Sequence, residues 1–468
     1  MKSQESQQLT QGITDARSLG RPKMILLGLQ HTFAMFGATV LVPLLTGLNI
    51  STTLLMAGLG TLLFHLITRG KVPAFLGSSF AFLGGYAAVA PLQNGQPNLE
   101  MLPYACGGVV FAGLLYVILS ALIKVFTVEK VMKFFPPVVT GPIIISIGLI
   151  LSPSAINNAK TDWPLALIAL FAIIFFNMWG RGMMKIVPIL LGVLIAYGFA
   201  LLTGKVDLSN IGNTDFFALP PVMFAKFDIS AIITIMPIAI ATMMEHIGDI
   251  SAIGATTGKN YIVNPGLHRT LLGDGLATVM ASLLGGPANT TYGENTGVLA
   301  LTKVYDPLVI RIAACFAIIL SVIPKFAVII ESIPAAIIGG VSLILYGMIS
   351  AVGIRNLVEN RVNFKNTRNT IITAIILVCA LGFNEIGGIK FHLSSVTITL
   401  SGLAIASIVG IIANWLLPGK DYVFDKDEDQ EELFETYQGA TSRRLSEEDM
   451  KEYEKRIRER ELKRKDNK

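Results

Sequence analysis

Long apolar stretches alternate with short polar connections along most of this chain. The stretches are about 17–25 residues long, which is the length that crosses a bilayer as a helix. The connections are charged or rich in glycine and proline. The pattern predicts an all-α polytopic membrane protein with about 14 transmembrane spans, near 23–46, 52–68, 72–92, 102–124, 134–155, 163–180, 185–203, 229–256, 266–285, 288–303, 307–330, 332–354, 367–383 and 396–417.

Seven of these spans precede a longer connection at 204–228, and seven follow it. An odd number of spans per half places the halves in opposite orientations, which is the inverted-repeat plan of many secondary transporters. Two short echoes fit this 7+7 plan. One pairs Phe135, Pro136, Pro137 and Gly141 with Ile333, Pro334, Ala335 and Gly339, and the other pairs Gln30 and His31 with Glu245 and His246.

The composition excludes an ordinary soluble protein. Of the 468 residues 52% are hydrophobic and 15% are charged, and the mean hydropathy is +0.62. The net charge of +5 does not indicate nucleic-acid binding, because the basic residues are scattered through short connections without a basic-aromatic patch. The lipid bilayer is therefore the expected partner.

The basic residues predict the orientation of the chain. Alternate connections, at 68–71, 124–133, 181–185, 257–269, 303–311 and 355–368, carry about fifteen Lys and Arg residues against about five in the others. Both termini are therefore expected on the cytoplasmic side of the cell inner membrane. The polar start has no small-residue cleavage site, so we expect no removable signal peptide.

Nothing in the chain indicates an enzyme, a cofactor or a metal. The three cysteines, Cys106, Cys315 and Cys379, lie in apolar segments and support neither a disulfide framework nor a metal cluster. The spans lack the zinc-protease, nucleophile-elbow and aspartyl-dyad motifs of membrane hydrolases. The string from Gly254 to Asn260 has the wrong glycine spacing for a phosphate loop.

The last 49 residues differ sharply from the rest, since they hold 16 of the 32 acidic residues alongside 13 basic ones. They predict a charged cytoplasmic tail. Ser446 and Asp449 are placed to cap a helix over 447–465. A solvated tail and a regulatory or partner-binding arm both fit this composition.

Acidic groups inside the predicted spans are the first candidates for function, because a charge at bilayer depth is costly. They are Glu245 and Asp249 in the eighth span, Asp274 in the ninth and Glu294 in the tenth. Glu245 and Asp249 are four residues apart, so they share one helix face about 5–6 Å from each other and can address one ligand or share a proton. Asp274 lies between Gly273 and Gly275, where it could instead hold the packing of neighbouring helices.

The third span of each half is interrupted. Residues 77–82 read Gly-Ser-Ser-Phe-Ala-Phe, and residues 285–297 hold Pro287 within a dense run of Gly, Asn and Thr. Neither composition favours continuous helix. Non-helical backbone at membrane depth survives only where protein or a wet cavity satisfies it. Two such breaks at corresponding positions point to a binding site near the bilayer midplane.

These breaks suit a planar, neutral ligand with alternating donors and acceptors. Backbone N–H groups at Phe80 and Gly293 would donate to ligand carbonyls, and Glu245 and Glu294 would accept ligand N–H groups. The rings of Phe80 and Tyr292 would stack on a planar ring. An inorganic anion would call for Arg or Lys, which the two breaks lack.

Over residues 24–417 the chain resembles the nucleobase–ascorbate transporter family, also called the second nucleobase:cation symporter family. The motifs that carry the resemblance are Glu294-Asn295-Thr296-Gly297 with Thr302-Lys303, Gln30-His31, Gly77-Ser78-Ser79-Phe80-Ala81-Phe82, Glu245-His246-Ile247-Gly248, Pro265-Gly266-Leu267-His268-Arg269 and Thr290-Thr291-Tyr292-Gly293.

The resemblance implies a core domain of spans 1–4 and 8–11, a gate domain of spans 5–7 and 12–14, short antiparallel strands in spans 3 and 10, and often a homodimer. The resulting parts are 1–22 (N-terminal segment), 23–126 and 229–330 (core), 127–228 and 331–417 (gate) and 418–468 (tail). At the gate start we expect close packing against the core by Pro136, Pro137, Gly141, Pro334, Gly339 and Gly340.

The resemblance also implies roles for single residues. Glu245 and Glu294 would hold a nucleobase, completed by the backbone at Phe80 and Gly293 and by the ring of Tyr292. Coupling is assigned to Asp249, His246 and Asp274, with support from Gln30, His31, Ser79, Thr291 and Asn295.

The signature begins with Glu294, as in the family's uracil branch, which favours a uracil:proton symporter working by alternating access. Asp249 departs from that branch, whose proton symporters often have His there, and resembles the xanthine branch. A xanthine/uracil permease with sodium coupling and an anion exchanger of similar fold are the alternatives.

Overall fold

The computed structural model describes residues 12–93, 97–126, 136–393 and 396–419. The predicted tail helix over 447–465 and the position of Phe135 lie outside these residues. Within them the chain is mainly helical, with four short strands.

The first half follows the predicted spans closely. Its elements are η1 (Ala16–Leu19), α2 (Arg21–Thr46), α3 (Ile50–Ile67), β1 (Leu76–Ser78), η2 (Phe80–Phe82), α4 (Leu83–Val89), α5 (Leu102–Phe126), α7 (Pro137–Ala159), α8 (Trp163–Trp179), α9 (Met183–Ile186), α10 (Pro188–Leu202) and α11 (Ser209–Gly212).

The second half repeats the alternation of long helices with a break in its third segment. Its elements are α12 (Ile229–Ile235), α13 (Ile238–Thr257), η3 (Ile262–Gly266), α14 (Leu267–Leu283), β2 (Asn289–Thr291), α15 (Gly293–Thr302), α16 (Pro307–Ser321), α17 (Pro324–Glu331), α18 (Ala335–Glu359), α19 (Thr367–Glu385), β3 (Ile389–Leu393), β4 (Val396–Leu400) and α20 (Gly402–Leu416).

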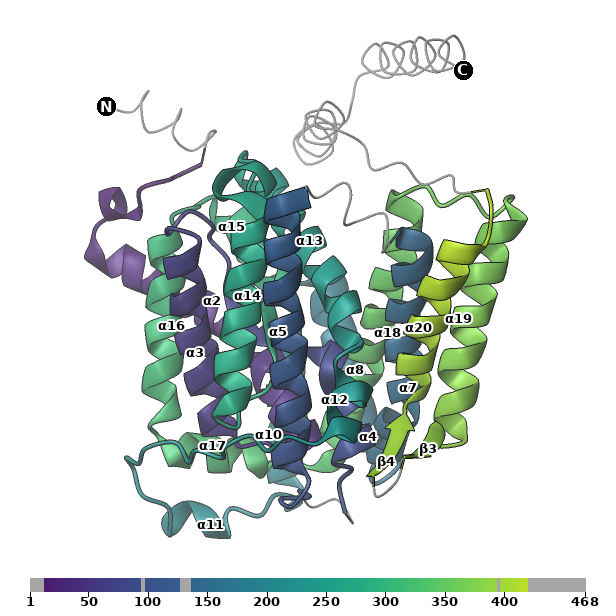
Figure 1. The fold of residues 1–468 in the computed structure, drawn as a ribbon. Coiled ribbons are helices and arrows are strands. Elements are labelled where there is room, and N and C mark those ends of the chain that lie inside the picture. Colours follow the sequence, from purple (N-terminus) through teal and green to yellow (C-terminus); the bar gives the residue numbers. More distant parts are fainter. Residues whose placement is uncertain (1–11, 94–96, 127–135, 394–395, 420–468) are drawn as a thin grey trace.

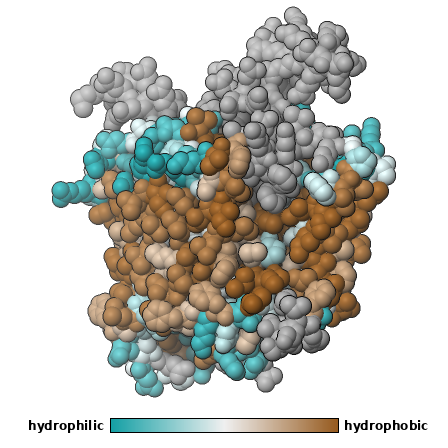
Figure 2. Space-filling model, viewed as in Figure 1, coloured by the Kyte–Doolittle hydropathy of each residue, from teal (hydrophilic) through white to brown (hydrophobic). Residues whose placement is uncertain are grey.

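Among the described residues, seven helices are long and apolar enough to cross a membrane, counting α12 with α13 as one. An eighth is added if the bent pair α16 and α17 forms one span. The other predicted spans consist of shorter helices and broken segments, so the number 14 stays a prediction. On the face shown in Figure 2 a broad apolar band crosses the molecule between two more polar ends.

Two predicted spans are wrong as single helices. The span at 307–330 bends by 83° between α16 and α17, where Pro324 opens a new helix. The span at 396–417 begins as β4, which pairs antiparallel with β3. Its helix starts only at Gly402, after the Ser401 side chain caps the N–H of Ala404.

The helices pack as two groups, and Figure 1 shows α2, α3, α5, α14 and α16 on the left and α7, α18, α19 and α20 on the right. In one group α14 packs on α5 and α3, and α16 packs on α2 and α3. In the other, α18 packs on α7 and α8, α10 packs on α8, and α19 packs on α7 and α20. The division into a core and a gate, with the boundaries given above, stays a prediction.

The glycines at the gate start do not pack against the core, so that expectation was wrong. A Cβ on Gly141 would lie 2.6 Å from Leu357 Cδ2, and one on Gly353 would lie 2.6 Å from the Gly141 carbonyl oxygen. A Cβ on Gly339 would overlap the backbone nitrogen of Ala159. These glycines therefore bring α7 and α18 into backbone contact inside the gate.

This contact predicts that Gly339→Leu destabilises the gate itself. The new side chain has no room against the α7 backbone, so we expect a loss of about 1–3 kcal/mol or more, measured as a lower midpoint of thermal unfolding in detergent. Gly347→Leu in the same helix is the matched control, because a Cβ there has no atom within 4 Å. Equal midpoints for the two variants would contradict this packing.

Candidate functional site

The two sequence breaks meet as a pair of short antiparallel strands. β1 and β2 pair with Leu76 opposite Thr291, Gly77 opposite Thr290 and Ser78 opposite Asn289. Two further backbone bonds extend the pair, from Tyr292 N to Phe75 O at 3.0 Å and from Ser79 N to Ala288 O at 2.9 Å. All six strand residues are buried. Segments more than 200 residues apart in sequence thus share one frame.

Side chains from neighbouring helices close the open edges of this strand pair. Thr61 of α3 accepts a hydrogen bond from Leu76 N at 2.9 Å and donates to Leu76 O at 3.2 Å. Thr278 of α14 donates to Asn289 O at 2.8 Å. The Asn289 amide in turn donates to Met56 O of α3 at 3.0 Å. The polar backbone is therefore satisfied by protein at membrane depth.

A helix begins directly after each strand, and neither start has a side-chain cap. η2 and α4 follow β1 from Phe80, and α15 follows β2 from Gly293. Because the strands are antiparallel and only three residues long, both helix N-termini face the region over the strand pair. The first N–H groups of a helix have no partner within it and carry partial positive charge, so this region favours acceptor oxygens.

Three carboxyl groups lie beside these helix starts. Glu245 and Asp249 are one turn apart on α13, and Glu294 is in the first turn of α15. All three are half-buried. A Cβ placed on Gly293 would lie 3.7 Å from Asp249 Oδ1, which brings the α13 face against the start of α15. The predicted acids are thus brought together.

The acidic face is accessible. Gly248 on α13 and Gly293 and Gly297 on α15 are exposed, and a Cβ on Gly248 or Gly297 would meet nothing within 4 Å. Phe80 is half-buried at the start of η2, which contacts α13. A planar molecule therefore has access to carboxylate acceptors and backbone donors at one place.

Asp274 and His246 lie beneath this face and are completely buried. Asp274 Oδ2 is 3.3 Å from His246 Nδ1, and the Thr291 hydroxyl is 3.4 Å from the same nitrogen. Thr291 also donates to Asp249 Oδ2 at 3.1 Å. A continuous chain of polar contacts therefore joins α14, α13 and β2, and Asp249 is the member with access to the open face.

The supporting residues fix α15 and the strands. Tyr292 is buried, and its hydroxyl donates to Ser78 O at 2.8 Å. Its ring packs on Gly77, where a Cβ would lie 2.5 Å from the ring. This contact explains why residue 77 is glycine, because any side chain there would displace the Tyr292 ring. Stacking of Tyr292 on a ligand stays a prediction.

Asn295 ties α15 to the first helix. Its Nδ2 donates to His31 O at 3.1 Å and lies 3.1 Å from His31 Nδ1. Gln30 Oε1 and Ser79 Oγ are buried, and neither makes a hydrogen bond within the described part of the chain. Contacts with Asn295 and Ala288 link His31 and Ser79 to the strand pair and α15, and the supporting roles of Gln30, His31 and Ser79 stay predictions.

Thr61 and Thr278 were missed from the sequence. Threonine is common in membrane helices, where its hydroxyl usually bonds its own backbone one turn back, as Thr32 and Thr46 do here. Only the structure of the strand pair reveals that these two threonines form hydrogen bonds with the backbone of another segment.

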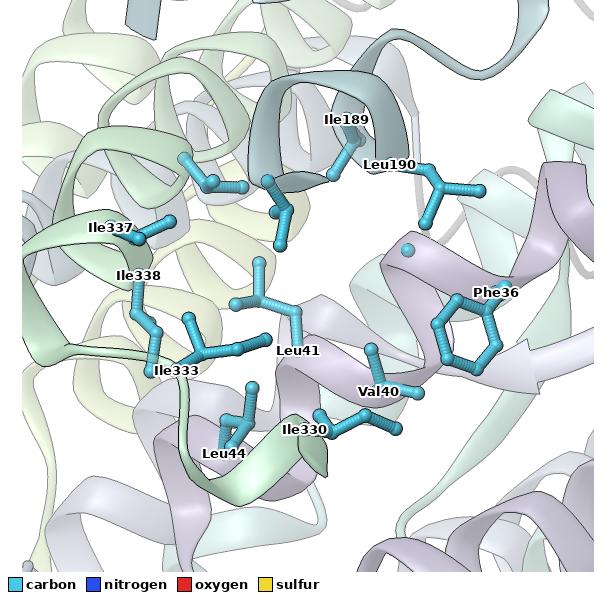
Figure 3. A pocket seen from close by; sticks show the side chains of 13 residues that line it. Phe36, Val40, Leu41, Leu44, Ile189, Leu190, Ile330, Ile333, Ile337 and Ile338 are labelled. Atoms are coloured by element: carbon cyan, nitrogen blue, oxygen red, sulfur yellow. The ribbon is translucent and has the colours of Figure 1, made fainter. Parts of the chain in front are cut away.

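An apolar cavity lies away from the carboxylates, between helices of the two groups. It is lined by side chains of α2, α10, α17 and α18 and of the α17–α18 connection, with Phe36, Leu41, Ile189 and Ile337 around it (Figure 3). It offers no hydrogen-bonding side chain to a polar ligand. Among the described residues, no group of three or more His, Cys, Asp or Glu is placed to hold a metal.

Comparison with known proteins places this chain in a family. A model described as a permease family matches residues 22–386. The chain is 41% identical over 423 residues to the uracil permease of Bacillus caldolyticus, covering 87% of this chain and 94% of that protein. It is 40% identical over 396 residues to the uracil permease of Escherichia coli K12, covering 82% and 89%.

A solved structure shares the fold. The transmembrane domain of a cyanobacterial bicarbonate transporter, BicA, superposes with a TM-score of 0.52 at 14% identity, covering 86% of this chain and 99% of that domain. The family match is broad, and the apolar helices require a bilayer. The chain is therefore a multi-pass membrane transporter that belongs to this permease family, the nucleobase–ascorbate transporters whose motifs it carries.

Proposed function

We propose that this chain imports uracil in symport with protons, by alternating access. The observation that carries the proposal is the convergence of two half-buried carboxylates, Glu245 and Glu294, with two uncapped helix starts on an accessible face. Uracil is planar and presents N–H donors next to C=O acceptors. The carboxylates accept its N–H groups, and the backbone at Phe80 and Gly293 donates to its carbonyls.

The side chains at the two breaks favour uracil over an inorganic anion as the substrate. The solved bicarbonate transporter shares the fold, but neither residues 77–82 nor residues 285–297 of this chain contain Arg or Lys. An anion bound there would meet three carboxylates without a neutralising side chain from the breaks. The names of the relatives, two of which are uracil permeases, further support uracil over other substrates.

Asp249 is the proposed proton carrier. It faces the ligand region at one end of the polar chain that continues through Thr291 and His246 to Asp274. A carboxyl group that binds and releases a proton at this position couples its charge to the charges of Glu245 and Glu294. Sodium coupling is the alternative, with Asp249 as an oxygen ligand.

Alternating access follows from the two helical groups. The site belongs to the group with α13, α14 and α15, and the other group, built on α7 and α18, faces it. Movement of one group against the other would expose the site to each side in turn. As the basic connections predict, both termini lie in the cytoplasm, and the chain sits in the inner membrane. We retain a homodimer as the proposed assembly.

Loss of either carboxylate is expected to abolish tight binding. Glu245→Gln and Glu294→Gln each replace an acceptor by a partly donating amide, so uracil affinity should fall roughly 5- to 150-fold, measured by equilibrium binding of labelled uracil to purified protein. Glu331→Gln is the control, because Glu331 is an exposed carboxylate at the end of α17. Unchanged affinity in both site variants would refute the assignment.

Asp249→Asn is expected to separate binding from coupling. The amide keeps an oxygen beside Thr291 but cannot carry a proton, so uracil binding and exchange should persist while accumulation against a gradient disappears. Uptake into vesicles with and without an uncoupler measures this. Uptake that requires sodium and ignores the uncoupler would exclude proton coupling.

Filling the cavity of Figure 3 is expected to slow transport without weakening binding. If the two groups move, the shape of this cavity changes during the cycle. The larger side chain of Val341→Phe should fill the cavity and keep the two groups in the arrangement of this structure. We expect uptake to fall roughly tenfold, about 1.4 kcal/mol of barrier, with affinity unchanged. Val352→Phe, 37% exposed on the same helix, is the control. Equal uptake by both variants would argue against this movement.

A further inference from the structure

The connection that follows Asn213 and leads to α12, residues 214–228 and here called the crossing loop, exposes more apolar surface than a loop in water tolerates. Leu219 is 87% exposed and Phe224 71%. The exposed set also includes Phe216, Phe217, Val222 and Phe227. Contiguous apolar patches of this kind mark contact with a membrane or another protein.

Backbone hydrogen bonds hold this loop across the ends of several spans. Met223 N donates to Leu284 O at 3.4 Å, Ala225 N to Leu283 O at 3.1 Å, and Lys226 N to Pro103 O at 2.9 Å. In addition, Thr52 of α3 donates to Pro221 O at 2.6 Å. The loop is therefore built into the ends of α3, α5 and α14 and is not a free tether.

The loop is two-sided. Met223 and Ala225 are half-buried toward the helix ends, while Val222, Phe224 and Lys226 between and beside them are exposed. This alternation is that of an extended strand with one face packed. The outward face is apolar although nothing in the described chain covers it.

The outward face continues the lipid-facing surface of α5. Phe227 meets Phe111 of α5 edge to face, with ring centroids 5.9 Å apart. Phe111 begins a line of exposed apolar residues one turn apart along α5, followed by Leu114, Ile118, Leu122 and Val125. The crossing loop runs along the lower ends of the helices in Figure 1, at the lower edge of the apolar band in Figure 2.

Cationic and aromatic groups mark the same edge. The Lys226 ammonium lies 5.7 Å from the centre of the Tyr104 ring, and both residues are on the side where the loop crosses α5. Lysine and aromatic side chains are enriched where headgroups meet acyl chains.

We propose that the crossing loop is a membrane-interface anchor, with its apolar side chains inserted among the lipids of the leaflet on its own side. Lipid is the occupant that this surface fits, because the surface is continuous with the lipid-facing stripe of α5 through Phe111 and Phe227. The anchor holds the ends of α3, α5 and α14 at a fixed depth in that leaflet.

Tryptophan fluorescence in vesicles tests the anchor. In a chain whose three tryptophans, Trp163, Trp179 and Trp415, are replaced by Phe and which still takes up uracil, Phe224→Trp provides a single probe. We expect bromines placed near the headgroups to quench it at least about twofold more than bromines near the bilayer centre. Acrylamide in the water should quench it weakly.

The matched control is Asn213→Trp in the same background. Asn213 is exposed directly after α11, which projects below the loop in Figure 1, so acrylamide alone should quench it. Strong acrylamide quenching of Phe224→Trp without a bromine effect would overturn the proposal. A second outcome would also overturn it. If bromines quench the probe in nanodiscs that hold one copy of the protein but not in nanodiscs that hold two, the loop is covered by a second copy and not by lipid.

Discussion

Satisfying the polar backbone inside the bilayer is the constraint on which this structure depends. A membrane has no water to complete a broken helix, so each interrupted segment must find partners elsewhere. β1 and β2 find them in each other, and Thr61 and Thr278 close the edges that a two-stranded sheet leaves open. The helices that restart after the strands begin without a side-chain cap. The proposed binding region thus lies where the two breaks pair.

The acidic residues around the β1–β2 pair lie at two depths. Glu245, Asp249 and Glu294 line the accessible face, whereas Asp274 and His246 form a buried pair below it. Thr291 belongs to both levels, since its backbone pairs within the strands and its hydroxyl meets Asp249 and His246. A change of charge at Asp249 therefore bears on the strand that positions Gly293 and Glu294. The residues proposed for ligand contact and for coupling are linked through this one short segment.

Residue pattern alone predicted the long helices, both breaks and the meeting of the acids. Pro287 with its Gly-, Thr- and Asn-rich neighbours cannot form continuous helix, and the four-residue spacing of Glu245 and Asp249 fixes their common face. Residue pattern alone could not predict most contacts between distant segments, and the antiparallel strands of spans 3 and 10 were implied only by the family resemblance. The apolar run 307–330 was predicted as one span although α16 and α17 meet at 83° beside Pro324, and Gly339 gives no sign of which helix it meets. The β-branched run Val396–Leu400 did carry a strand signal, which we took for the start of a span.

The pairing of β1 with β2 also sets an order for making the protein. The two strands are separated by more than 200 residues, as the 214-residue interval between Ser78 and Tyr292 shows. At a synthesis rate of roughly 5–20 residues per second, β1 waits some tens of seconds for its partner. During that time its backbone cannot rest in lipid unsatisfied. Shielding of β1 by the insertion machinery until the ribosome has delivered β2 would meet this need, so the centre of the protein closes later than the outer helices insert, although β2 emerges well before the chain ends.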